Sequence, residues 1–172
     1  LNDPFLTQYF RFVKNACQGD LGISYFHNKP TVEIILRKAP ATLELVFVTS
    51  IIILFITFPV GVYSALRPTS WFSRFAMGAS TIGVAVPVFL TAIVLIYIFG
   101  VELQWLPAFG RGDTVNVGGW ETGLLTKDGL LHLILPSFSL ASIMLPRYIR
   151  LIRSEMMEVL ETEYIKFAWA KG

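Results

Sequence analysis

The sequence predicts an all-α integral membrane protein, a polytopic helical bundle with three transmembrane helices. Two observations carry this prediction. Of the 172 residues, 54% are hydrophobic and only 15% are charged, whereas an average soluble domain has about 25% charged residues. The charges are also missing from three long stretches of 22, 27 and 18 residues. A helix needs about 20 apolar residues to cross the hydrocarbon layer of a bilayer.

The first two uncharged stretches are long enough to span a bilayer by themselves. The third is shorter, but Arg147 and Arg150 follow it and can extend their charged ends toward lipid headgroups. A soluble protein with three buried core helices is disfavoured because only eight residues separate the first two stretches. The predicted spans are about 42–66, 75–100 and 131–153.

The N-terminal segment, residues 1–41, is predicted to lie outside the membrane. Apolar residues recur at helical spacing between Pro4 and Gln18, which indicates an amphipathic helix. A turn-rich loop should follow, then a short helix from Thr31 to Lys38 and a break at Pro40. Thr42 would then cap the first span of a transmembrane domain over 42–172.

The distribution of Lys and Arg predicts the orientation of the chain. Residues 67–74 and 147–172 hold seven Lys/Arg in 34 residues, whereas 1–41 and 101–128 hold seven in 69. Basic residues near span ends mark the cytoplasmic side. We therefore expect the N-terminal segment outside, a long external loop at 101–129, and the C-terminal segment, 154–172, in the cytoplasm.

Small and hydroxyl residues fall on one face of each of the first two spans, where they allow helices to approach closely in lipid. Ordinary helix packing explains such faces. The alternative is that they line a pathway, and four prolines spread over three spans favour a moving or cavity-lining bundle. The pathway-lining candidates are Ser50, Thr57, Gly61, Ala79, Gly83, Pro87 and Thr91.

No catalytic, cofactor-binding or metal-binding constellation is expected from the sequence. The chain has no phosphate-binding G-x-x-x-x-G-K-[ST] motif, so it should not hydrolyse ATP. His27 and His132 are far apart and lack nearby ligand partners, which disfavours a metal site and an intramembrane enzyme. The net charge of +2 is too small to argue for nucleic acid. The tripeptide at 111–113 matches an adhesion motif by chance.

The C-terminal stretch is the sharpest feature of the sequence. The third span should continue as a helix to about Leu160, and a short helix should follow from Glu161 or Thr162 to Ala170. This short helix mixes charged and large apolar side chains. It could lie on the lipid surface or dock into a groove on a partner.

Short strings occur along the whole chain in a specific order. They are Gly19-Asp20-Leu21-Gly22 with Ser24 and Thr31-Val32, Pro40-Ala41-Thr42-Leu43-Glu44-Leu45, Leu106-Pro107 with Gly110, Leu135-Pro136, and a run from Arg150 and Arg153 through Met157, Glu158, Val159 and Leu160 to Gly172. In these strings the sequence resembles the inner-membrane permease subunits of bacterial ABC importers in the dipeptide, oligopeptide and nickel group. The resemblance implies a complete subunit of six spans, of which this fragment would hold the second, third and fourth.

The resemblance also implies partners and a role for the C-terminal stretch, which is similar to the cytoplasmic coupling loop of the family. Its general motif has Glu six residues before its glycine, and Lys166 stands there, as in the peptide and nickel branch. The implied partners are a second homologous permease subunit, two cytoplasmic ATP-binding subunits and an extracytoplasmic substrate-binding protein. A channel or membrane-anchored assembly protein without energy coupling is the alternative. The implied ATPase-coupling residues are Glu163, Tyr164, Lys166, Phe167, Ala168, Ala170, Lys171 and Gly172.

Overall fold

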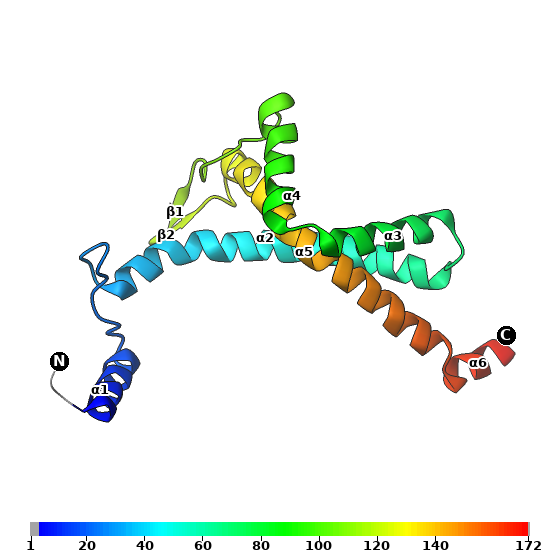
Figure 1. Ribbon diagram of the computed structural model, residues 1–172, viewed down its shortest axis with the longest axis horizontal. Coiled ribbons are helices and arrows are strands. Elements are labelled where there is room, and N and C mark those ends of the chain that lie inside the picture. Colours follow the sequence, from blue (N-terminus) through cyan, green and yellow to red (C-terminus); the bar gives the residue numbers. More distant parts are fainter. Residues whose placement is uncertain (1–3, 172) are drawn as a thin grey trace.

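The computed structural model describes residues 4–171, with the side chains of 166, 168 and 169 left out (Figure 1). The regular structure of the described residues consists of helices and one small hairpin, joined by loops. Its elements, in order, are α1 (Phe5–Cys17), α2 (Thr31–Leu66), α3 (Trp71–Ala85), α4 (Val88–Leu95), the π-helix η1 (Ile96–Glu102), β1 (Val115–Val117), β2 (Trp120–Thr122), α5 (Lys127–Leu160) and α6 (Glu163–Ala170).

The two long helices, α2 and α5, form the centre of the bundle. In Figure 1 they cross near the middle of the molecule, α3 runs back beside α2, and α4 leaves the crossing at a steep angle. Within the described residues, α2 and α5 are long and apolar enough to cross a membrane, and α3 with α4 and η1 makes a third span if the bent pair counts as one. The predicted polytopic helical membrane fold is confirmed.

α2 begins earlier than the predicted first span. The helix runs without interruption from Thr31 through Pro40, so the predicted break at Pro40 and the cap at Thr42 are wrong. The Oγ1 hydroxyl of Thr42 donates to the Lys38 carbonyl at 3.4 Å, as an interior helical threonine does. Pro40 removes one backbone donor, but it is buried and α2 stays helical on both sides of it.

The predicted second span is broken rather than straight. α3 ends at Ala85, α4 begins at Val88, and the helix axes change direction by 109° between them. Val86 is extended, with φ −81° and ψ 122°, because the residue before a proline is sterically pushed out of the helical region. Pro87 then starts α4 as its N-cap.

The long loop after the second span contains a hairpin that the sequence analysis missed. β1 and β2 pair antiparallel, with Val115 opposite Thr122 and Val117 opposite Trp120. Gly118 and Gly119 both have positive φ in the turn, as a two-residue hairpin loop requires. The hairpin ends near the start of α5, which Thr126 caps by accepting from the Gly129 N–H at 3.0 Å.

The bundle is held by close packing of small residues. A Cβ placed on Gly61 of α2 would lie 2.7 Å from the Ile152 side chain of α5, and one on Gly83 of α3 would lie 2.9 Å from Pro146. Small residues let helices approach closely where apolar burial gives no advantage over lipid. The buried small and hydroxyl residues of these helices include Thr49, Thr57, Ser64, Ser73, Ser80, Ser137, Ser139 and Ala141.

Candidate functional site

The C-terminal arm consists of the last turns of α5 and the short helix α6. After α5 ends at Leu160, the Thr162 hydroxyl donates to the Val159 carbonyl at 2.7 Å and closes a tight turn into α6. Figure 1 shows α6 at the far end of α5, well separated from the crossing of α2 and α5. Only Glu161 and Thr162 separate α6 from α5, so the two helices are joined by a short connection.

The surface of α6 carries two large aromatic side chains that are mostly exposed. Tyr164 is 79% exposed and Phe167 is 61% exposed, and the Lys171 ammonium lies 4.7 Å from the Phe167 ring centroid. Exposed aromatic residues beside charge are typical of interface anchors.

The predicted coupling residues are brought together on this one helix and its end. Glu163, Tyr164, Phe167 and Ala170 lie in α6, and Lys171 follows it. Lys166 and Ala168 also belong to α6, but their side chains lie outside the described part of the structure, and Gly172 lies outside the described residues.

The predicted pathway residues do not form a single face. Gly61 is buried against Ile152 of α5 and Thr57 is also buried, while Ser50 is exposed and its hydroxyl donates to the Val46 carbonyl at 2.8 Å. Ala79 is exposed on α3, and Gly83 packs against Pro146 of α5.

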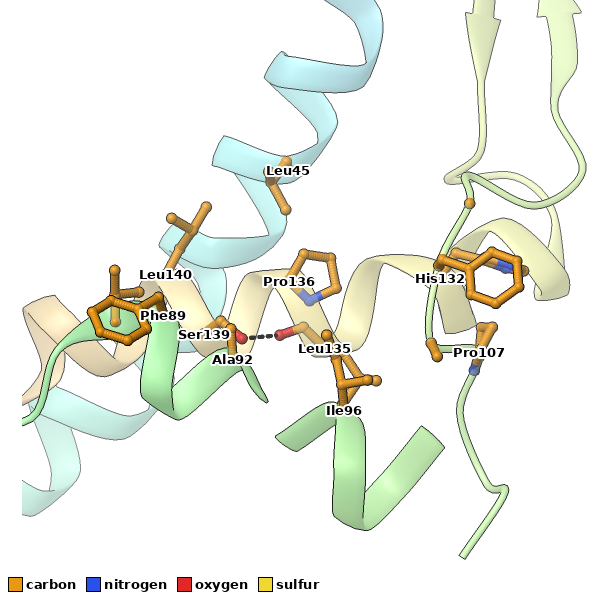
Figure 2. A pocket seen from close by; sticks show the side chains of 14 residues that line it. Leu45, Phe89, Ala92, Ile96, Pro107, His132, Leu135, Pro136, Ser139 and Leu140 are labelled. Carbon is orange, nitrogen blue, oxygen red and sulfur yellow. Dashed lines mark hydrogen bonds between the residues drawn. The ribbon is translucent and has the colours of Figure 1, made fainter. Parts of the chain in front are cut away.

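Pro87 and Thr91 lie at the bend and in α4, next to a cavity. The cavity has a volume of about 440 Å³ and lies between α4, the segment 107–110 and α5. Figure 2 shows Phe89, Ala92 and Ile96 of this cavity facing Leu135, Pro136 and Ser139 of α5. Its polar side chains are Ser139, whose hydroxyl donates to the Leu135 carbonyl at 2.8 Å, and His132.

His132 is held at one end of this cavity by the first turn of α5. Its Nδ1 lies 2.8 Å from the Asp128 carbonyl oxygen and 3.5 Å from an Asp128 carboxylate oxygen. His132 was recognisable in the sequence, but the cavity was not. The available signal in the sequence was its prolines: Pro87 marks the bend before α4, and Pro107 and Pro136 both line the cavity.

A buried ion pair joins α2 to the loop after the second span. Glu44 is only 4% exposed, and its Oε1 accepts from Arg111 Nη2 at 3.2 Å and from the Gly123 N–H at 3.2 Å. Arg111 also donates to the Glu121 carbonyl at 2.6 Å. This pair was not predicted. Glu44, which directly precedes the first uncharged stretch, was the available signal, because a charge so close to a span is usually paired.

Among residues 4–171, no group of three His, Cys, Asp or Glu residues is placed to hold a metal ion. The described structure combines a span broken at Pro87, an apolar cavity beside it and a C-terminal arm with an exposed aromatic surface. These features define a polytopic helical membrane protein.

Comparison with known proteins identifies the family within that class. Residues 57–172 match the binding-protein-dependent transport system inner membrane component family. This match covers more than half of the chain, and the chain belongs to this family.

Similar proteins cover the chain from end to end. It is 37% identical over 184 residues to a dipeptide transport system permease protein of Alkalihalophilus pseudofirmus and 39% identical over 173 residues to an oligopeptide transport system permease protein of Bacillus subtilis. An oligopeptide transport system permease protein of Salmonella typhimurium is 32% identical over 173 residues. Each alignment covers 100% of this chain and between 52% and 55% of the relative. The chain therefore spans about half the length of the curated relatives it matches.

Proposed function

We propose that this chain is part of the transmembrane permease subunit of an ABC importer and forms part of the pathway for peptides or related small solutes. The relatives named as dipeptide and oligopeptide permeases support the solute class. The chain itself has no catalytic role or cofactor, and ATP is bound and hydrolysed by partner subunits.

The observation that carries this proposal is the arm formed by α5 and α6. The exposed Tyr164 and Phe167 lie on a short helix joined by a tight turn to a spanning helix. An ATP-binding subunit that grips this surface can turn its own closure into a rigid-body movement of α5. A channel without energy coupling would have no use for such an arm.

The partners follow from this role. A second homologous permease subunit completes the pathway, two cytoplasmic ATP-binding subunits contact the α6 arms, and an extracytoplasmic binding protein delivers the solute. The subunit lies in the inner membrane, with residues 1–41 outside and 154–172 in the cytoplasm. The greater density of Lys and Arg on the latter side supports this orientation.

The test is uptake of a labelled dipeptide and a labelled tetrapeptide by proteoliposomes that contain the full-length subunit with its partners. We expect uptake to require ATP and the binding protein encoded with the transporter. Omitting either component is the control. Uptake that proceeds equally well without ATP would identify a channel and overturn the proposal.

A further inference from the structure

The loop between α1 and α2 presents two aromatic side chains at its tip. The Ser24 N–H donates to the Lys29 carbonyl at 2.9 Å, and the Asn28 N–H donates to the Ser24 carbonyl at 2.9 Å. Tyr25 and Phe26 are 98% and 97% exposed in this closed turn. The backbone hydrogen bonds hold the turn in shape, and adjacent aromatics fully exposed on such a turn favour a covering partner.

A charged groove lies directly beside this turn. It has a volume of about 610 Å³, and its walls come from the turn, from the first two turns of α2 and from the loop after the second span. Its charged side chains are four cations and two carboxylates, which gives a net charge of +2. The lining residues are Phe26, His27, Lys29, Glu33, Ile34, Arg37, Lys38, Arg111 and Glu121.

The ion pairs among these side chains leave an excess of positive charge in the groove. Lys29 lies 3.9 Å from Glu33, and Arg111 pairs with Glu44 and Glu121. Within the described residues, no ion pair is found for Arg37 or Lys38, and both are exposed. The groove therefore offers two cations to a carboxylate from elsewhere.

The groove lies apart from the predicted span and from the apolar cavity. Arg37 and Lys38 precede Glu44, where the uncharged stretch of α2 begins, by seven and six helical residues, or about 9–11 Å along the helix. The groove therefore lies beyond the predicted span. It also shares no lining residue with the apolar cavity between α4 and α5, so it is not part of that space.

We propose that this groove and the aromatic turn beside it form a docking surface for an acidic patch on the extracytoplasmic binding protein. The inference rests on the proposed function, which supplies that partner. Arg37 and Lys38 attract and orient the acidic patch, and Tyr25 and Phe26 bury apolar area once it is seated. Exposed charges of this kind act mainly on the rate of association and on orientation.

The test measures association of the purified binding protein encoded with the transporter, using the complete importer in lipid nanodiscs. We expect R37E/K38E to lower the association rate constant about ten-fold at low ionic strength and to weaken its salt dependence. Phe26→Ala should instead raise the dissociation rate. K14E/K127E reverses two exposed cations outside the groove and is the matched control, with wild-type association expected.

The outcomes separate this inference from the proposed function. ATP hydrolysis without the binding protein reports intact assembly, and R37Q/K38Q replaces the reversal variant if that variant fails to assemble. Unchanged association in R37E/K38E or R37Q/K38Q, with normal stimulation of ATP hydrolysis, overturns the docking surface and leaves the proposed function standing. Loss of assembly with the second permease subunit in both variants would make this face a subunit interface, which also overturns it. A wild-type importer that no binding protein stimulates overturns the proposed function itself.

Discussion

Arg111 and Glu44 are 67 residues apart in the chain, yet Nη2 of Arg111 lies 3.2 Å from Oε1 of Glu44. The carboxylate is almost fully buried, and its other oxygen, Oε2, has no hydrogen-bond partner within the described residues. Glu44 therefore depends on Arg111 and on the Gly123 N–H for compensation of its charge. The pair fixes the hairpin loop to the end of the spanning part of α2.

The first prediction is that removing one partner of this pair lowers the free energy of unfolding more than removing both charges. Arg111→Ala leaves a buried carboxylate with one backbone donor, and we expect it to lower the free energy of unfolding by about 2 kcal/mol. Removing one partner of a fully buried pair typically costs more, but Arg111 is 30% exposed. E44Q/R111A should recover at least half of that loss. Thermal unfolding of the full-length subunit in detergent measures the stability of both variants. Equal losses in the two variants would show that the unpaired charge of Glu44 does not cause the destabilisation.

The second prediction concerns the contact of α2 with α5. Gly61→Ala places a methyl group 2.7 Å from Ile152, so the helices must move apart, at a cost of about 1–3 kcal/mol. G61A/I152A should restore stability by making room. Gly78→Ala is the matched control, because nothing lies within 4 Å of a Cβ there. If Gly61→Ala and Gly78→Ala unfold at the same temperature, the close approach of the helices is not a stabilising contact.

The third prediction concerns orientation. Cysteines introduced at Thr69 and Thr114, both exposed, should react with a membrane-impermeant maleimide from opposite sides, with Thr114 labelled from outside intact cells. The free, exposed Cys17 is first replaced by serine. Thr69 is preferred to Ser70 because the Ser70 hydroxyl caps α3 by accepting from the Ser73 N–H at 3.1 Å. Labelling of both cysteines from outside would rule out the proposed topology.

Much of the fold follows from local properties of the chain. The gaps in charge marked the apolar parts of α2 and α5, and the periodicity of residues 4–18 marked α1. The C-terminal arm could also be predicted, because Glu161 and Thr162 interrupt the apolar periodicity between α5 and α6. In each case a single segment carries the signal.

The predictions fail where contacts between distant segments determine the local structure. Pro40 and Pro87 look alike as local helix breakers, but α2 continues through the buried Pro40, while the exposed Pro87 marks a bend. The Glu44–Arg111 pair and the cavity beside α4 both need the loop to fold back on the bundle. The residues that form the ion pair and the cavity are not separated by a characteristic sequence spacing, so sequence alone could not predict either feature.

The fourth prediction tests the arm. Phe167→Ala and Tyr164→Ala should each weaken binding of the ATP-binding subunits about 30-fold, the factor that corresponds to a loss of about 2 kcal/mol at an interface anchor. Stability of the isolated subunit should not change, because both side chains are exposed. Trp105→Ala removes a similarly exposed aromatic from the loop after the second span and should bind normally. Normal binding in both arm variants would contradict the proposed contact.

The fifth prediction concerns the bend between α3 and α4. Pro87→Ala removes the steric restriction on Val86, so α3 and α4 can join into one helix. Spin labels at 75 and 97 should then move apart, since 22 residues span about 33 Å in a straight helix and about 19 Å with the axis turned by 109°. Straightening should also remove α4 from the wall of the apolar cavity and abolish peptide uptake.

The matched control for this bend is Pro59→Ala. Pro59 lies inside α2, which is helical on both sides of it, so labels on either side of position 59 should keep their separation. If Pro87→Ala leaves the distance between 75 and 97 unchanged, packing of α4 against α5 maintains the bend without help from the proline. If the distance grows and uptake persists, the bent span is not required for transport, because the cavity would be lost without consequence.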